Sequence, residues 1–145
     1  MKTLGWAVAA LATSALAGGD ASPAFIRIQG GAEVWKAGTP PFPPTVQVAV
    51  LEGDPKAAGH FTVRVKLPKG LALAPHTHPN DERATLLSGA LWVGEGKTAD
   101  RAKAQRLGAG SFYVNPKGQA HFVTAEEDTV LQISTDGPWG TQKVE

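Results

Sequence analysis

The sequence predicts an all-β protein, and three observations carry that prediction. The 145-residue chain contains 17 glycines and 11 prolines, which recur between short apolar runs as is typical of strands joined by turns. Turn signals follow one another about every ten residues, a spacing that favours a sandwich, a jelly roll or a small barrel. The one helical candidate, 97–105, is polar throughout and too short to be stable alone, so we expect a surface loop with one helical turn there. The predicted strands are 45–51, 61–67, 71–78, 83–87, 90–93, 111–114, 120–124 and 129–134.

The first residues have the pattern of a secretory signal peptide. Lys2 precedes an apolar run over 4–16, which is too short for a confident membrane span and has no polar face up to residue 12. An amphipathic first helix is therefore the weaker interpretation. Small residues after the run supply cleavage positions. We expect a signal peptide at 1–21, cleaved after Ala17, Ala21 or Ala24, and an exported, periplasmic or secreted domain at 25–145.

Composition narrows the classes of partner. The chain carries 14 basic and 13 acidic residues for a net charge of +1, and no basic run is concentrated on any segment. That balance gives no basis for nucleic-acid binding or stable membrane insertion, so we expect a small-molecule ligand. Because the chain has no cysteine, thiolate ligands and a cysteine nucleophile are excluded. Stability must come from the core, helped by a metal or by oligomerisation.

A proline-rich segment precedes the first predicted strand. Four of the five residues from 40 to 44 are proline, which excludes a helix and predicts an extended arm or an edge strand. This arm would suit a contact between the subunits of a homodimer. Further along the chain, we expect tight hairpins at Gly89 and Gly118, where a positive φ is needed.

Two histidines one residue apart form the first chemical signal. His76 and His78 lie on a predicted strand, where side chains alternate between faces, so both point the same way about 7 Å apart. Glu82 follows four residues later, past a bend at Pro79. Many surface strands carry such a pair without binding anything, so the pattern alone leaves both a metal site and an ordinary strand edge open.

Two spaced patterns of glycine, histidine, glutamate and proline run through the middle of the chain. The first comprises Gly70, His76, His78, Glu82 and Gly89, and the second Gly110, Pro116, Gly118 and His121. They resemble the two conserved motifs of the cupin superfamily, in particular its small, exported, quercetinase-like members. That resemblance implies a double-stranded β-helix, which is a jelly-roll barrel, with one divalent transition metal bound by three histidines and one glutamate. The implied metal ligands are His76, His78, Glu82 and His121. The chain departs from the second motif at Ala125, where an asparagine that does not bind the metal is usual.

Such a donor set suits Fe, Mn, Ni, Co, Cu or Zn better than calcium. Four protein ligands on a six-coordinate ion leave two open positions, whereas the same four on tetrahedral zinc leave none and make a structural site. The resemblance favours a metal-dependent oxidoreductase of the dioxygenase type, acting on a small organic ligand chelated at the metal. Glu82 would then be catalytic, shifting between ligand and base. A non-catalytic ligand or metal sensor and an isomerase or lyase acting on a sugar or hydroxy acid remain alternatives.

The surroundings of the site follow from alternation. If His121 points inward, so does Val123, and the cavity beside the metal is small and apolar. Nearby aromatic residues would complete the lining of the cavity. The sequence does not determine which face of its strand each of these side chains occupies. His60 is expected to be an exposed turn residue, and Trp139 to cap the barrel or contact a second subunit. The aromatic candidates are Phe61, Trp92, Phe112 and Tyr113.

Overall fold

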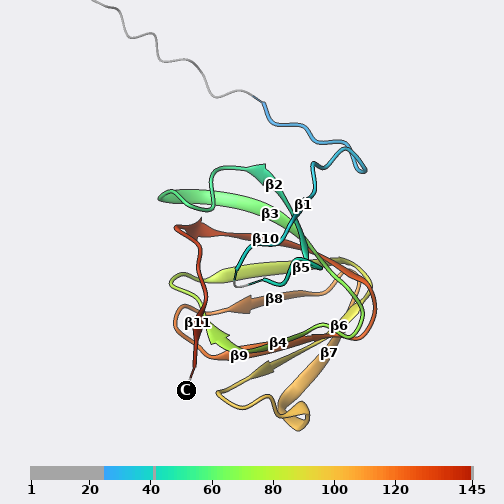
Figure 1. Ribbon diagram of the computed structural model, residues 1–145, viewed down its shortest axis with the longest axis vertical. Coiled ribbons are helices and arrows are strands. Elements are labelled where there is room, and N and C mark those ends of the chain that lie inside the picture. Colours follow the sequence, from blue (N-terminus) through green and yellow to red (C-terminus); the bar gives the residue numbers. More distant parts are fainter. Residues whose placement is uncertain (1–24, 41, 145) are drawn as a thin grey trace, which may run out of the picture.

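The protein is an all-β barrel of two antiparallel sheets, as the sequence predicts (Figure 1). A computed structural model describes residues 25–40 and 42–144. The expected signal peptide at 1–21 and its three cleavage positions lie outside these residues, so export stays a prediction. Within the described part of the chain, no helix is long and apolar enough to cross a membrane.

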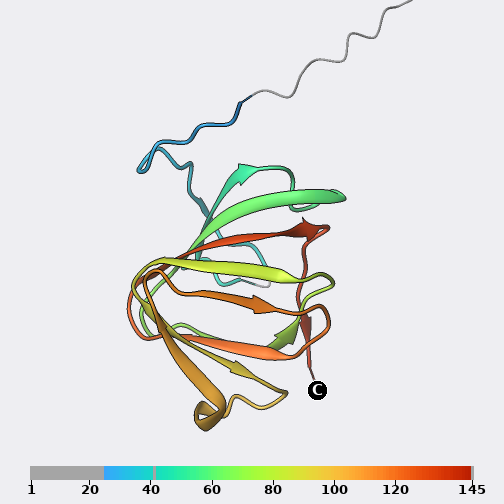
Figure 2. The ribbon, with the colours of Figure 1, turned by 180° about the vertical axis from the view of Figure 1, so that it is seen from behind.

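Among the described residues, eleven strands form the two sheets, which lie one above the other when the barrel is seen from either side (Figures 1 and 2). A 3₁₀ turn, η1 (Arg101–Lys103), precedes β7. The six-stranded sheet has the order β1 (Lys36–Ala37), β2 (Gln47–Glu52), β3 (Gly59–Leu67), β10 (Thr129–Gly137), β5 (Glu82–Ser88) and β8 (Phe112–Asn115). The five-stranded sheet has the order β11 (Gln142–Lys143), β4 (Ala72–Thr77), β9 (His121–Ala125), β6 (Ala90–Glu95) and β7 (Ala104–Gly108).

The core lies between the sheets because one face of each long strand is apolar. Successive side chains of a strand point to opposite faces, so residues two apart line the same face. Each buried aliphatic or aromatic side chain contributes about 1.5–3 kcal/mol, which lets the core hold a barrel that has no disulfide. The buried apolar residues of β3, β5 and β10 are Phe61, Val63, Val65, Leu67, Ala84, Leu86, Leu131 and Ile133.

The prediction for 97–105 was right about the helical turn and wrong about the residues after it. Residues 101–103 form one 3₁₀ turn, but Ala104 begins strand β7, which pairs antiparallel with β6. The sequence AQRLG has little apolar alternation, and β7 is the edge strand of its sheet. An edge strand is held by main-chain pairing with one neighbour, so its side chains carry only a weak strand signal.

Gly89 and Gly118 adopt the positive φ expected of them, at +78° and +71°, but neither lies in a hairpin. Gly89 joins β5 to β6, yet β5 pairs with β10 and β8 whereas β6 pairs with β7 and β9. Gly118 lies between β8 and β9, which also belong to different sheets. Each glycine therefore lies in a connection that carries the chain from one sheet to the other.

The segment just before β2 and the C-terminal segment pack against the barrel, whereas the first described residues extend away from it (Figures 1 and 2). The N-terminal arm forms β1, which pairs with β2, and its Phe42 lies 5.8 Å between ring centroids from Trp139. At the other end, β11 extends the five-stranded sheet beside β4. The arm thus packs on its own barrel through Phe42, and a homodimer stays a prediction.

Gly89 and Gly110 offer a matched test of this architecture. A Cβ at Gly89 would meet the Asp128 carbonyl and the Thr129 side chain, whereas a Cβ at Gly110, with φ of +85°, would meet nothing within 4 Å. We expect Gly110→Ala to lower the free energy of unfolding by about 1–2 kcal/mol, the cost of the left-handed backbone alone. Gly89→Ala should cost about 3 kcal/mol or more because a steric clash adds to that strain. Urea denaturation of both variants measures the difference, and equal losses would contradict the close crossing at Gly89.

Candidate metal centre

Three of the four residues implied as metal ligands come together through strand pairing. His76 lies near the end of β4, and His121 is the first residue of β9. Their Cα atoms are directly paired in the antiparallel ladder, which places both side chains on the same face of the sheet. His78 follows two residues after His76 and returns to that face, as alternation predicts.

The histidine rings form a compact group. Ring centroids are 5.0 Å apart for His76 and His78, 4.3 Å for His76 and His121, and 5.1 Å for His78 and His121. One ring nitrogen from each residue lies within 4.8 Å of the others, a spacing that fits coordination of one metal ion. His78 and His121 are buried and His76 is partly buried, so the group is open on the His76 side.

Main-chain carbonyls determine which nitrogen of each ring faces the centre. The Nδ1 atoms of His76, His78 and His121 lie 2.7, 2.8 and 3.2 Å from the carbonyl oxygens of Ala74, Gly140 and Gln119. A carbonyl oxygen only accepts hydrogen bonds, so each Nδ1 must carry the proton and donate it. The three Nε2 atoms are then left with free lone pairs, which is the arrangement of histidine ligands in metal sites.

Glu82 lies beside this group, next to His78. It is the first residue of β5 and is buried. Asn115, its Cα partner on β8, donates a hydrogen bond of 2.9 Å from Nδ2 to Glu82 Oε1. The other oxygen, Oε2, lies 3.2 Å from His78 Nε2. Because both of these atoms present lone pairs, a proton or a metal cation between them is required to make the contact favourable.

Burial shifts the pKa values of all four side chains toward their neutral forms. Desolvation lowers the pKa of His76 and His78, and together with the neighbouring His76 it lowers that of His121 to about 4. The pKa of Glu82 is raised to about 6 by burial, against the opposing hydrogen bond from Asn115. At pH 7 the site therefore holds three neutral imidazoles and one carboxylate. This donor set fits a divalent transition metal.

A cavity of about 30 Å³ lies at the centre of this group, deep inside the barrel. Its walls are otherwise apolar and include Leu73, Val123 and Tyr113, in agreement with the predicted small apolar cavity. Burial and the nearby Glu82 raise the pKa of Tyr113, so its phenol stays protonated. The space suits an ion with one or two small ligand atoms and excludes bulk water.

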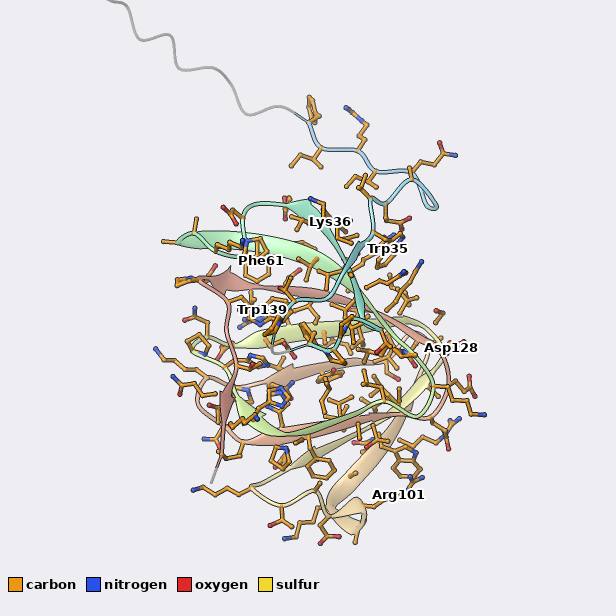
Figure 3. The ribbon with its side chains drawn as sticks, viewed as in Figure 1. Trp35, Lys36, Phe61, Arg101, Asp128 and Trp139 are labelled. Atoms are coloured by element: carbon orange, nitrogen blue, oxygen red, sulfur yellow. The ribbon has the colours of Figure 1, made fainter. Side chains whose placement is uncertain are left out.

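Trp139 closes one end of the barrel over the site. Its ring lies 6.1 Å from that of His78 and 5.6 Å from that of Phe61, between ring centroids, and Figure 3 shows Phe61 and Trp139 lying close together. Of the other aromatic candidates, Phe112 is 60% exposed. Trp92 stacks with Arg101, whose Cζ is 4.0 Å from the ring centroid. Neither Phe112 nor Trp92 lines the cavity.

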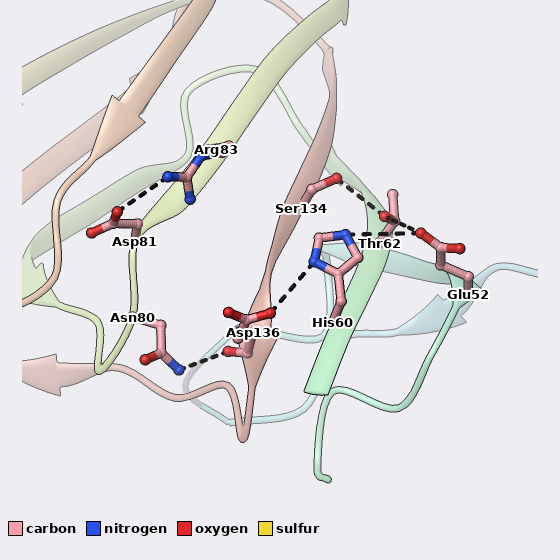
Figure 4. A network of polar contacts seen from close by, with 8 residues as sticks. All are labelled: Glu52, His60, Thr62, Asn80, Asp81, Arg83, Ser134 and Asp136. Carbon is pink, nitrogen blue, oxygen red and sulfur yellow. Dashed lines mark hydrogen bonds and ion pairs between the residues drawn. The ribbon is translucent and has the colours of Figure 1, made fainter. Parts of the chain in front are cut away.

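The fourth histidine, His60, belongs to a polar network on the surface (Figure 4). Its ring nitrogens lie 3.9 Å from Glu52 and 3.5 Å from Asp136, and its side chain is more than half exposed. The same figure shows Arg83 paired with Asp81 at 3.2 Å, on the outside of the barrel. His60 therefore takes no part in the buried group.

Sequence reasoning missed the residues that orient the ligands. Asn115 was not singled out, although it directly precedes Pro116 of the second motif. The carbonyl of Gly140 is 62 residues away from the His78 ring that it orients. A main-chain carbonyl has no side-chain signal, so only the folded chain identifies it.

Comparison with known proteins identifies the family to which the chain belongs. Residues 41–142 match the family model DUF4437, described as a domain of unknown function. The chain belongs to the DUF4437 family. It is 38% identical over 80 residues to germin-like protein 3-1 of Oryza sativa subsp. japonica, covering 54% of this chain and 35% of that protein. The chain spans less than half the length of the curated germin-like relatives it matches.

Solved structures show the same double-stranded β-helix fold at low sequence identity, which confirms the predicted jelly-roll barrel. The polyketide cyclase RemF of Streptomyces resistomycificus has a TM-score of 0.69 at 13% identity, covering 84% of this chain and 87% of RemF. An RmlC-like cupin of Shewanella frigidimarina has a TM-score of 0.59 at 14%, covering 75% and 87%. Salicylate 1,2-dioxygenase of Pseudaminobacter salicylatoxidans has a TM-score of 0.50 at 18%, covering 57% and 24%.

The pKa shifts predict how metal affinity depends on pH. At pH 7 and above, the lowered histidine pKa values and the Glu82 pKa of about 6 leave all four side chains of the metal-free site in their ligand forms, so the affinity for Co²⁺ should change little up to pH 8. Below pH 6 the metal must displace the proton of Glu82, so the affinity should fall by at least about tenfold per pH unit. Below pH 4, protonation of His121 makes the decline steeper. This differs from the decline through the ordinary histidine range near pH 6 that unshifted histidines would give.

Competition titrations of Co²⁺ with a chelator at each pH measure this curve. His60→Ala is the matched control, since it removes an exposed histidine and should leave the curve unchanged. A decline that begins at pH 7, with two or more protons released per metal, would contradict the lowered histidine pKa values.

Burial of Glu82 also predicts opposite effects of one substitution on stability and on binding. The folded-state pKa lies above the ordinary value of 4.5, so the ionised form is disfavoured in the fold and its cost appears as the pH rises through about 6. Removing that cost, Glu82→Gln should stabilise the metal-free protein at pH 7.5 by about 2 kcal/mol. The difference should vanish at pH 4.5, where Glu82 is largely protonated in the fold. In the same variant, the affinity for Co²⁺ at pH 7.5 should fall.

Chemical denaturation with chelator present, at both pH values, measures the stability change. A Glu82→Gln variant that is less stable than the natural protein at pH 7.5 would contradict this prediction. It would show that the contacts of the ionised carboxylate stabilise the fold by more than its burial costs.

Proposed function

We propose that this cupin is a metal-dependent oxidoreductase of the dioxygenase type that acts on a small organic ligand. The observation that carries the proposal is the convergence of three Nε2 lone pairs, with Glu82 alongside, on a small, water-excluding apolar cavity. If Glu82 joins the histidines as a fourth ligand, a six-coordinate ion keeps two open positions, which two oxygen atoms of a ligand, or one ligand atom and O₂, would occupy.

A bound redox-active transition metal would supply the electron transfer and the Lewis acidity that such chemistry needs. The side chains of the protein supply the rest. Asn115 holds Glu82 Oε1, which leaves Oε2 as the atom that accepts a proton from a substrate hydroxyl. Leu73 and Val123 make the walls of the same space apolar.

The comparisons support the proposal at the level of the fold. One solved structure of the same architecture is a salicylate 1,2-dioxygenase. Another is a polyketide cyclase, so the shared fold serves more than one reaction. The specific observation that favours a rival is the small volume of the cavity, about 30 Å³. A cavity of that size also suits a non-catalytic cupin that binds or senses a metal ion.

An oxygen-consumption screen tests the proposal. Protein loaded separately with Fe²⁺, Mn²⁺, Ni²⁺, Co²⁺, Cu²⁺ and Zn²⁺ is mixed with flavonols, catechols and 1,3-diketones while O₂ uptake and products are measured. We expect uptake with at least one redox-active metal and one substrate class, and none with Zn²⁺. His121→Ala should lose the metal and the uptake together, whereas His60→Ala should keep both.

Each other outcome points to a different function. Stoichiometric metal binding without O₂ uptake on any substrate would favour the metal sensor. Turnover of a sugar or hydroxy acid without O₂ would favour an isomerase or lyase. A protein that binds none of the metals would contradict the metal centre itself.

A further inference from the structure

A groove of about 190 Å³ runs along the outer edge of β4, next to the metal centre. Most of its wall is apolar and comes from Phe42 of the N-terminal arm and from Leu71, Leu73 and Pro75 of the β4 segment. Its volume is below the usual range of drug-sized sites, about 300–1,000 Å³. A ligand that fills it would have one ring rather than several.

Two polar residues of the C-terminal segment line the same groove, Thr141 and Lys143. Lys143 is directly paired with His76 between β11 and β4, so the two side chains leave the same face of the sheet. Thr141 precedes Lys143 by two residues and shares that face by alternation. Cationic, hydroxyl and imidazole groups therefore gather where the groove approaches the metal centre.

Neither polar group has a partner that explains its position. Thr141 Oγ1 is buried, with no hydrogen-bond partner among the described residues, and a buried hydroxyl without a partner costs stability. Lys143 forms no salt bridge within residues 25–40 and 42–144. An anionic oxygen entering the groove would pair with the Lys143 ammonium, and rotation of the Thr141 side chain about χ1 would let its hydroxyl donate to the same oxygen.

The groove and the metal cavity are neighbours. Phe42, Leu73 and His76 line both spaces, so these three side chains form the boundary between them. A ligand held in the groove would thus lie against the exposed side of His76, where the histidine group is open.

We propose that this groove binds a small aromatic monocarboxylate, with its ring against the apolar wall and its carboxylate on Lys143 and Thr141. One cation and one hydroxyl match one carboxylate, whereas the apolar wall offers nothing to the many hydroxyls of a sugar. This proposal names a substrate class for the proposed function. It rests on the proposed function in one respect only, which is that the bound carboxylate is a substrate.

Benzoate is the probe, titrated by calorimetry and by amide NMR into chelator-treated protein. We expect saturable binding that shifts the amide signals of residues 71–74 and 141–143. Lys143→Met should weaken binding at least tenfold, because a charge-assisted hydrogen bond to the carboxylate is lost, whereas Lys143→Arg should keep affinity within a few-fold. Thr141→Val should weaken it about three- to tenfold. Benzyl alcohol, which lacks the charge, should bind at least tenfold more weakly than benzoate.

Lys56→Met is the matched control, since it removes one positive charge from an exposed turn outside the groove and should leave the affinity unchanged. Absence of saturable binding, or equal affinity in Lys143→Met, would overturn the assignment. Binding that requires the metal and ignores Lys143 would place the carboxylate on the metal instead, which overturns the groove and leaves the proposed function intact. Binding through Lys143 together with no O₂ uptake on any substrate would support the groove and contradict the proposed function.

Discussion

The antiparallel pairing of β4 with β9 is the constraint on which the rest of the site depends. It sets His76 opposite His121, and a slip of one residue would turn His121 outward and Phe122 inward. Two main-chain hydrogen bonds hold the far end of the pair, from Gly70 to the Ala125 carbonyl at 2.9 Å and from Ala125 to the Leu71 carbonyl at 2.8 Å. A register shift between Leu73 and His76 then sets His76 against His121. Ala125 is the position at which the chain departs from the second cupin motif. The hydrogen bonds at this position are made by the main chain of Ala125, so the absence of an asparagine side chain does not change the pairing of the two strands there.

Burial gives the site its chemistry and also makes it costly to the fold. A carboxylate and three imidazoles are removed from water, and the shifted pKa values of Glu82 and His121 record that removal. The apolar core between the sheets offsets the cost, because the chain has no disulfide to do so. The same dry surroundings strengthen every electrostatic interaction at the centre. The buried Nε2 atoms and the Glu82 carboxylate are therefore suited to a cation.

Segments from outside the central strands lie beside the histidine group. Phe42 of the N-terminal arm stands between the outer groove and the inner cavity, and it contacts Trp139 of the C-terminal segment. Trp139 in turn packs against His78. The barrel strands therefore hold the ligands, while Phe42 and Trp139 form part of the wall around them.

The sequence by itself predicted strands β2 to β6 and β8 to β10, because strand alternation and turn chemistry are local properties of neighbouring residues. His76 and His78 share a face for that reason. The set of four side chains came from the resemblance to the cupin motifs, in which the spaced glycines and histidines indicated where His121 and Glu82 belong. Tertiary structure alone decided that Gly89 and Gly118 lie where the chain crosses between sheets, that Ala104 begins a strand, and that Asn115 holds Glu82. It also brought Gly140 to His78 across 62 residues. These features depend on which distant segments meet, and main-chain pairing and carbonyl contacts leave no local pattern in the residues that make them.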